Sequence, residues 1–400
     1  MKLGIDRLLS DKKLLQALSG QRLALLGHPA SVTHSGQHTL DALMTLSDLE
    51  IVAAFGPQHG MRGDKQDNMI ETENYVDPKY GIPVFSLYGD VRRPTAKMMD
   101  AFDVLLVDLQ DIGTRIYTFV TTLAFMLDAC AEHQKSLWVL DRPNPAGRPI
   151  EGTILESGWE SFVGAAPMIM RHGLTLGEFA AWYVDLKKLP IDLHVIKMTE
   201  YDPEAAPGYG WPVFELPWIN PSPNASSLNM ARCFPGAVLF EGTTLSEGRG
   251  TTTALEVVGA PEINFEQILE RMHALKSEWL DACLIRHCFF EPTFHKHSGQ
   301  LCAGLQIHTD NSAYRHEIFK PYRIAALILK SIRLEYPDYN IWRSFPYEYE
   351  TERLAIDLLS GGTFLREWVD DANSNADDLE KRLTRDEALW SEYRTSSLIY

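Results

Sequence analysis

VLLVDLQDIGTRIY, residues 104–117, joins an apolar run to a dense group of polar side chains. The apolar run has the length and composition of a strand buried on both faces, and a helical pattern follows at 118–133. Open α/β sheets bind ligands beyond the carboxyl ends of their strands, so Asp108 and Asp111 are candidate site residues. Alternatively, these acids only cap the helix and pair with Arg115.

Strands and helices alternate through the first half of the chain. Apolar runs predict strands at 22–26, 49–55, 83–88, 137–140 and 192–198, with helical patterns at 5–18, 39–46 and 175–186. This alternation predicts an α/β fold with a doubly wound, mainly parallel sheet. The carboxyl ends of parallel strands share one edge, so the polar residues that follow four of these strands should converge there. They are His28, Gln58, His59, Asp108, Asp111, Arg115, Asp141, Arg142 and Asn144.

The pattern changes after about residue 260. A last strand of the first part is expected at 237–240. The remaining chain predicts helices and strands in a different arrangement, with helices at 265–275, 321–334 and 377–394 and strands at 283–290 and 302–309. A length of 400 residues also suggests more than one domain. We therefore predict two domains, 1–260 and 261–400.

The chain is acidic, with a formal net charge of −17. This charge argues against nucleic acid or an anionic membrane as the main partner. The five cysteines show no CxxC spacing, which favours reduced thiols in a cytoplasm-like compartment. No apolar run approaches the roughly 18 residues of a membrane span, and the N-terminus lacks the apolar core of a signal peptide. We therefore expect a cytoplasmic protein, with a processed periplasmic or secreted chain as the alternative.

Familiar catalytic motifs are missing from the sequence. It contains no GxSxG elbow, no HExxH pair and no nucleotide-binding glycine fingerprint. Acyl transfer, zinc-dependent hydrolysis and nucleotide binding are therefore not favoured. We predict neither a metal nor another cofactor, although a cluster of His28, His59 and Asp108 could bind a cation as the less favoured alternative.

Basic residues gather in the predicted loops of this acidic chain. Arginine binds planar carboxylate or phosphate groups through paired hydrogen bonds, so these residues predict a small anionic ligand, while some of them neutralise buried acids. They are Arg62, Arg92, Arg93, Arg115, Arg142, Arg171 and Arg249. The segment 209–224 is rich in tryptophan and proline, and its aromatic side chains either stack on a sugar ring or pin the loop onto the core.

A series of short motifs follows in order along the chain: FGPQHGMRG, PVFSLYG, RRPT, DLQDIGTRIYTF, LDRPNP, EG, SFVG, RHGLTLGE, PSPN, FPG, FEGTTLSEGRGTT and GAP. Together they resemble the exo-β-N-acetylmuramidase family, long known as a domain of unknown function. The resemblance runs from about residue 3 to the C-terminus.

The resemblance implies a glycoside hydrolase that removes a terminal β-linked N-acetylmuramic acid from the non-reducing end of peptidoglycan fragments. It implies a Rossmann-like larger domain, a smaller β-barrel-like domain and an active-site cleft between them. The lactyl carboxylate of the sugar would be the anion that the arginines predict, so the partner is a small amino sugar or muropeptide. No cofactor is implied.

One position departs from the family pattern. The family loop usually reads PEHG, and its glutamate is a catalytic candidate, whereas this chain has Gln58. A glutamine is neither a general acid nor a carboxylate base. Either Glu71 or Glu73 takes over, or Gln58 orients a water or the acetamido group while another acid transfers the proton. The third explanation is a different substrate or little activity, which would make the chain a non-catalytic muropeptide or amino-sugar binding protein.

Further site residues follow from the resemblance. We expect Glu151 to be the remaining catalytic acid, unless it only caps a helix. Tyr117, His59 and His172 are candidates for proton handling or substrate contact. Asn224 is a candidate for binding the acetamido group of the sugar.

Arginine recognition of the substrate also depends on neighbouring acids. Glu241 and Glu247 flank glycines and are expected to hold Arg249 in place. The full set of predicted substrate-binding residues is Arg62, Asp108, Asp111, Arg115, Asp141, Arg142, Asn144, His172, Asn224, Glu241 and Arg249. The sequence carries no signal for the stereochemical course of the reaction or for the oligomeric state.

Overall fold

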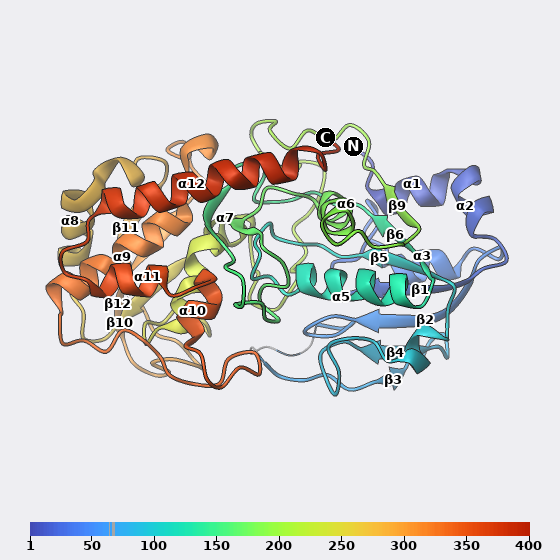
Figure 1. The fold of residues 1–400 in the computed structure, drawn as a ribbon, viewed down its shortest axis with the longest axis horizontal. Helices are drawn as coiled ribbons and strands as arrows, with labels where there is room; N and C mark the ends of the chain where they lie inside the picture. Colours follow the sequence, from blue (N-terminus) through green and yellow to red (C-terminus); the bar gives the residue numbers. More distant parts are fainter. Residues whose placement is uncertain (64, 66–68) are drawn as a thin grey trace.

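The computed structural model describes residues 1–63, 65 and 69–400. Its centre is a seven-stranded sheet in which all neighbouring strands are parallel except β3 and β4 (Figure 1). Across the sheet the strands are β3 (Tyr75–Val76), β4 (Pro83–Ser86), β2 (Glu50–Gly56), β1 (Arg22–Gly27), β5 (Val104–Asp108), β6 (Ser136–Leu140) and β9 (Leu193–Ile196). The order runs outward in both directions from β1 and β5, so the predicted mainly parallel α/β sheet is confirmed.

The two faces of this sheet pack against separate sets of helices. Along β1, Leu23 and Leu25 enter one apolar core, while Ala24 and Leu26 enter the other. Successive side chains of a strand point to opposite faces, so each face needs its own cover. The helices are α1 (Gly4–Ser10), α2 (Lys12–Leu18) and α3 (Thr39–Met44) on the first face, and α5 (Phe119–Glu132) and α6 (Leu176–Lys187) on the second.

A smaller sheet lies at the other end of the molecule (Figure 1). It is antiparallel and open, in the order β10 (Val257–Ala260), β12 (Cys302–His308) and β11 (Leu284–Phe290), so the barrel-like character expected here is not confirmed. β10 precedes the domain boundary predicted at 260 but pairs with β12; the boundary itself stays a prediction. The helices of this part are α7 (Leu228–Ala237), α8 (Phe265–Lys276), α9 (Pro321–Glu335), α10 (Ala355–Ser360), α11 (Phe364–Asp370) and α12 (Ala376–Thr395).

Two segments differ from the sequence prediction. Residues 237–240, predicted as a strand, belong to the end of α7 and to the 3-10 helix η1 (Val238–Gly242), which packs on α10. A short buried apolar run suits a strand and a buried helix equally well. The single helix predicted at 5–18 is broken at Asp11, whose side chain accepts a hydrogen bond from Lys13 N as the N-cap of α2. The remaining short elements are α4 (Ala96–Met99), β7 (Glu151–Ile154), β8 (Ile169–Arg171), η2 (Ser277–Trp279) and η3 (His316–Ile318).

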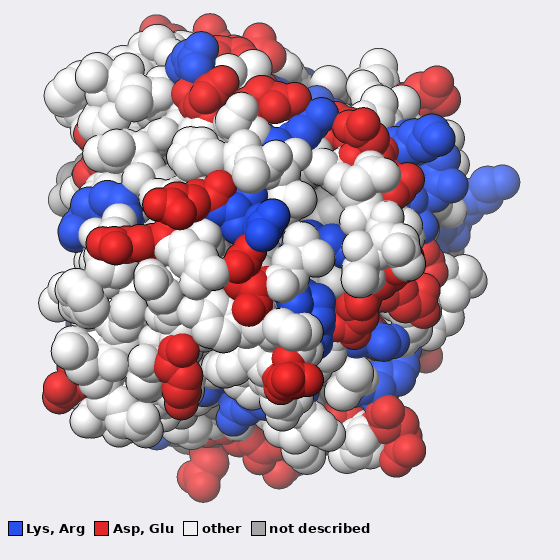
Figure 2. Space-filling view, turned by 90° about the vertical axis from the view of Figure 1, so that its left-hand side faces the viewer, with Lys and Arg blue, Asp and Glu red and all other residues white. Residues whose placement is uncertain are grey.

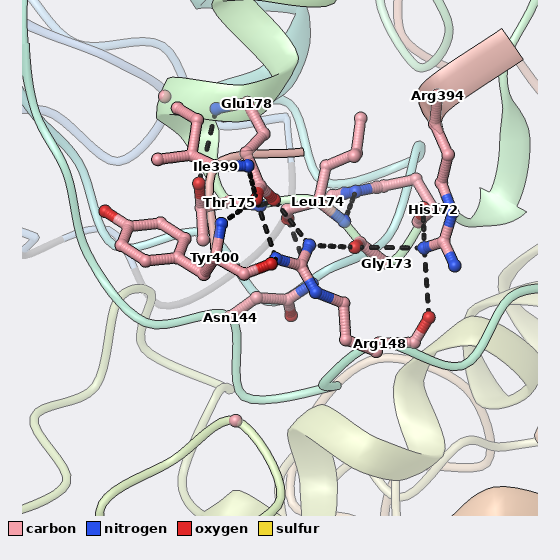
Figure 3. A network of polar contacts seen from close by, with 12 residues as sticks. Asn144, Arg148, His172, Gly173, Leu174, Thr175, Glu178, Arg394, Ile399 and Tyr400 are labelled. Carbon is pink, nitrogen blue, oxygen red and sulfur yellow. Dashed lines mark hydrogen bonds and ion pairs between the residues drawn. The ribbon is translucent and has the colours of Figure 1, made fainter. Parts of the chain in front are cut away.

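The C-terminal helix ties the two parts of the molecule together. α12 runs from the smaller sheet toward the central one (Figure 1) and packs against β7. Near its end, Trp390 Nε1 donates to His172 O at 2.9 Å and Arg394 Nη1 donates to Arg148 O at 3.0 Å. Arg148 in turn makes a buried bidentate pair with Glu178, at 2.6 and 2.7 Å (Figure 3). The contacts of Trp390 and Arg394 hold the end of α12 against the larger part of the molecule.

Acidic and basic side chains are mixed on the end face formed by the smaller part (Figure 2). All five cysteines are buried and carry free thiols. Within residues 1–63, 65 and 69–400, no group of three or more metal-binding side chains is placed to hold an ion. None of the helices described is both long and apolar enough to cross a membrane.

Candidate active site

A pocket lies beyond the carboxyl ends of β2 and β5, where later segments of the chain cover the edge of the central sheet. Gln58 comes from the loop after β2, Tyr117 from the loop after β5, and Glu241 and Glu348 from the later segments. The empty space within it, which includes the part open to solvent, is about 530 Å³. The pocket therefore occupies the edge at which open α/β sheets bind their ligands.

Gln58 and Glu348 are paired within this pocket. The amide Nε2 of Gln58 donates to Glu348 Oε1 at 3.2 Å, and Thr118 Oγ1 donates to Gln58 Oε1 at 2.7 Å. With its carbonyl oxygen accepting from Thr118, the Gln58 amide turns its nitrogen toward Glu348. The other carboxyl oxygen of Glu348 accepts a hydrogen bond from the Tyr88 hydroxyl at 2.8 Å. Both oxygens of this buried carboxyl are thus held in place.

The surroundings of Glu348 favour its protonated form. Burial raises the pKa of this carboxyl to about 7, since the side chain loses hydration, and the nearby charge of Glu241 acts in the same direction. The hydrogen bonds from Tyr88 and Gln58 and the charge of Arg92 partly oppose the rise. A carboxyl group that titrates near neutral pH inside a pocket is a candidate general acid or base.

Both loops that form this pair are conformationally constrained. A Cβ atom on Gly56 would lie 2.6 Å from Met61 N, so the turn after β2 requires glycine there. His59 and Glu348 adopt left-handed backbone conformations, with φ of 68° and 47°. Such conformations are uncommon outside glycine and gather at functional sites.

A second acid in the pocket, Glu241, is neutralised by arginine. Arg249 Nη2 donates to Glu241 Oε1 at 2.5 Å, and Arg249 Nε donates to Glu247 at 3.0 Å. The Tyr347 hydroxyl donates to the other oxygen of Glu241 at 2.7 Å. Burial opposes the charge of Glu247, yet Lys296 and Arg249 lower its pKa well below the usual range. The prediction that the two glutamates hold Arg249 in place is confirmed.

Aromatic rings form an apolar wall of the pocket. Tyr117 meets Phe119 and Phe234 edge to face, with ring centroids 4.8 and 5.8 Å away. Such a wall suits the apolar face of a sugar ring. The predicted site residues that line the pocket are Gln58, His59, Tyr117, Asn224, Glu241 and Arg249.

Glu151 lies elsewhere and caps a helix. Its carboxylate accepts hydrogen bonds from Tyr322 N and Arg323 N, both at 2.9 Å, at the first turn of α9. The side chain is fully buried, and burial raises its pKa. These contacts match the alternative left open by the sequence, in which Glu151 serves the helix terminus.

The acids after β5 and β6 are also satisfied within the protein. Asp108 forms a buried ion pair with Arg142, whose Nη2 is 2.9 Å from the carboxylate. Asp141 accepts hydrogen bonds from Gly177 N and Thr175 Oγ1, at 2.9 and 2.8 Å, at the start of α6. Burial raises the pKa of Asp141 to about 6. The pocket's lining includes none of these side chains.

Other predicted residues stabilise loops around the same edge. The guanidinium of Arg115 donates to the carbonyls of Thr153 and Leu359, at 2.8 and 2.9 Å, and is fully buried. Asp111 accepts from Gly113 N at 2.7 Å and lies 3.3 Å from His172 Nε2. Asn144 Nδ2 donates to Leu174 O at 3.0 Å (Figure 3). These side chains lie outside the pocket's lining.

Three predicted residues border a separate surface hollow beside the loop after β2. Arg62, Glu71 and Glu73 line it and are exposed. Arg62 stacks over the Tyr75 ring at 4.4 Å, and Glu71 accepts from the Tyr349 hydroxyl at 2.8 Å. The two glutamates are therefore not among the groups that line the pocket around Gln58.

The tryptophan-rich segment 209–224 is pinned to the protein. Trp211 and Trp218 pack against each other, with ring centroids 5.0 Å apart, and Trp218 Nε1 donates to Ala225 O at 2.9 Å. Ser222 and Asn224 at the end of this segment reach the pocket. The segment thus places two polar residues at the site while its indoles serve the core.

Sequence reasoning missed Tyr88, Tyr347 and Glu348. The segment 345–350, FPYEYE, alternates aromatic and acidic residues, which is a weak signal that also fits an exposed strand. The carboxyl group of Glu348 is hydrogen-bonded to Gln58, which is 290 positions away in the sequence. Only the fold brings these groups together.

Comparisons with known family models, proteins and structures all find similar proteins that match most or all of this chain. The family model for the N-terminal part of the exo-beta-N-acetylmuramidase NamZ matches residues 23–229, and that for its C-terminal part matches residues 232–400. The peptidoglycan beta-N-acetylmuramidase NamZ of Bacillus subtilis (strain 168) is 36% identical over 372 residues, which cover 93% of this chain and 84% of the relative. Two crystal structures of DUF1343 family proteins from Bacteroides fragilis NCTC 9343 are also similar, with TM-scores of 0.84 and 0.75 at 28% and 26% identity. Each covers 100% of this chain and is itself covered to 98%.

Proposed function

The chain belongs to the exo-β-N-acetylmuramidase NamZ family, and we propose that it is a glycoside hydrolase that removes terminal β-linked N-acetylmuramic acid from the non-reducing end of peptidoglycan fragments. The Bacillus subtilis relative is a peptidoglycan β-N-acetylmuramidase by name. The match covers 93% of this chain and 84% of the relative, so the proposal concerns the whole chain rather than one part of it.

The observation that carries the proposal is the pair of carboxyl groups in the pocket. Glu241 is balanced by Arg249, whereas burial raises the pKa of Glu348 to about 7. Glycosidases commonly use two carboxyl groups whose surroundings separate their protonation behaviour. The aromatic wall at Tyr117 and the amide of Asn224 supply surfaces for a sugar ring and its acetamido group.

The arginine that lines the pocket is already paired with acids of the protein, although the sequence analysis expected the arginines to bind an anionic substrate. Of the arginines singled out from the sequence, Arg249 lines the pocket, and Glu241 and Glu247 already share its charge. Recognition of a lactyl carboxylate at this site would have to draw on Arg249 in competition with these acids. Arg92 lies nearby, stacked on Tyr88 with its guanidinium carbon 4.4 Å from the ring centre.

The test is the release of N-acetylmuramic acid from a chromogenic β-N-acetylmuramide by the purified protein. The matching β-N-acetylglucosaminide is the control, because it lacks the lactyl group. Selective turnover supports the proposal. Tight binding of the sugar without turnover would favour the alternative, an amino-sugar or muropeptide binding protein in which Gln58 replaces the usual acid.

A further inference from the structure

Given the proposed function, on which this inference rests, we propose that Glu348 donates the proton to the glycosidic oxygen and that Gln58 positions it. Glu348 lines the pocket with 8% of its surface exposed, so the carboxyl can reach a bound sugar while water has little access. The proton that an amide at position 58 cannot supply thus comes from a carboxyl group near the other end of the chain.

The hydrogen bonds around Glu348 fix where its proton can lie. Tyr88 is buried, and burial raises the pKa of its phenol, so it remains a donor to Oε2. Gln58 donates to Oε1, because Thr118 already occupies its carbonyl oxygen. Each carboxyl oxygen accepts two hydrogen bonds, which leaves one position on each for the acidic hydrogen. Both oxygens of the carboxyl are therefore held in place, as a positioned proton donor requires.

Polar and charged groups face Glu348 from three segments of the chain. Gln58 comes from the loop after β2, Tyr88 and Arg92 from the segment after β4, and Glu241 from η1. Burial and Glu241 raise the pKa of Glu348, and the other three lower it, with a result of about 7. Both the acid and its conjugate base are then populated near neutral pH, as proton donation and recovery require.

The amide at position 58 supports this division of roles. A glutamate there would place a second carboxyl group beside Glu348, and two carboxylates in one site compete for a single proton. Gln58 instead donates a hydrogen bond and carries no charge. Glu348 can thus change its protonation state without a coupled neighbour at 58.

The proposed step balances with water as the only co-reactant. The bond between C1 of the N-acetylmuramic acid and the glycosidic oxygen breaks, and its electron pair passes to that oxygen. The oxygen takes the proton of Glu348 and leaves as an alcohol. Water supplies the hydroxyl group that ends on C1 and the proton that restores Glu348.

The test compares E348Q with wild type on two substrates that differ in their need for a proton. The N-acetylmuramyl-N-acetylglucosamine disaccharide has a poor leaving group, whereas the leaving group of 2,4-dinitrophenyl β-N-acetylmuramide departs without protonation. General acid catalysis contributes about 10²–10⁴-fold, so E348Q should lose that much kcat/KM on the disaccharide and less than about tenfold on the aryl glycoside. The matched control is E350Q, because Glu350 is bound to Arg353 at 2.6 Å outside the pocket's lining. It should change neither rate.

Each outcome decides the assignment. Equal losses by E348Q on both substrates, or none on the disaccharide, overturn it while leaving the proposed function intact, since wild-type turnover establishes that function. Absence of wild-type turnover on both substrates overturns the assignment of Glu348 and the proposed function together. If E348Q fails to fold, Y88F replaces it: loss of the Tyr88 hydrogen bond should raise the pKa of Glu348 and move the alkaline limb of the kcat/KM profile to higher pH. A limb that stays in place overturns the assignment.

Discussion

The polar residues after β5 and β6 and those after β2 look alike in sequence but differ in the folded protein. Asp108 and Asp141 are completely buried and bound by an arginine and a helix terminus. Gln58 and Glu348 instead line a pocket, where burial raises the pKa of Glu348 to about 7. The contrast teaches that a buried carboxyl group is available for chemistry where it lines a pocket, and not where an ion pair or a helix terminus takes up its hydrogen bonds. Substitutions in the two regions should therefore have opposite consequences.

The largest effect on stability is expected in the satisfied region. D108N leaves the guanidinium of Arg142 buried without its counter-charge, which costs about 3–5 kcal/mol of unfolding free energy. Chemical denaturation measures this loss. The control is Lys79→Met, which removes the partner of Asp41 in an exposed pair and should change stability little. If D108N were as stable as wild type, the ion pair would not be the structural element that its burial indicates.

The opposite sign is expected for E348Q above neutral pH. The pKa of Glu348 lies at about 7 in the folded protein instead of the usual 4.5. The folded state therefore holds this proton more tightly, and wild type loses stability as the pH rises from about 4.5 to 7. At about 1.4 kcal/mol per pH unit, the loss of unfolding free energy is about 3 kcal/mol. The glutamine of E348Q does not titrate, so the variant does not show this loss. The free energy of unfolding, measured by denaturation at pH 4.5 and at pH 8, should fall less for E348Q than for wild type. An equal fall in both proteins would contradict the raised pKa.

A smaller loss of stability is expected for E151Q, and its activity per folded molecule should be unchanged. The amide oxygen of a glutamine can accept from only part of the α9 terminus that the carboxylate now serves. The cost should be about 2 kcal/mol of unfolding free energy. Activity per folded molecule should match wild type on both glycosides. A variant of full stability but greatly reduced kcat would instead return Glu151 to the catalytic role that the sequence suggested.

The sequence predicted the central sheet well because its signals are local. Apolar runs, followed by turn residues and a helical period, mark β1, β2, β5 and β6 without any knowledge of the fold. The error at η1 arose where a buried apolar run has no period of its own to distinguish helix from strand. The smaller sheet needs β10 to pair with β12 across more than forty residues, which no local pattern encodes.

The pocket was only partly predictable for the same physical reason. Gln58, Tyr117 and Asn224 could be selected because loops after strands lie at the ligand-binding edge. Whether an acid there is neutralised depends on groups that arrive from elsewhere in the chain. Arg142 neutralises Asp108, whereas the described side chains that donate to the Glu348 carboxyl are the neutral Tyr88 and Gln58.

The smallest effect, a shift in pH dependence, is expected for Q58E. A carboxyl group at position 58 removes a hydrogen bond that lowers the pKa of Glu348 and adds a like charge. The alkaline limb of kcat/KM should move up by about one pH unit, equivalent to about 1.4 kcal/mol, with the maximal rate largely kept. Loss of all activity in Q58E would mean that the amide has its own essential contact with substrate. Activity that appears only in Q58E would mean that the wild-type chain binds what its relatives cleave.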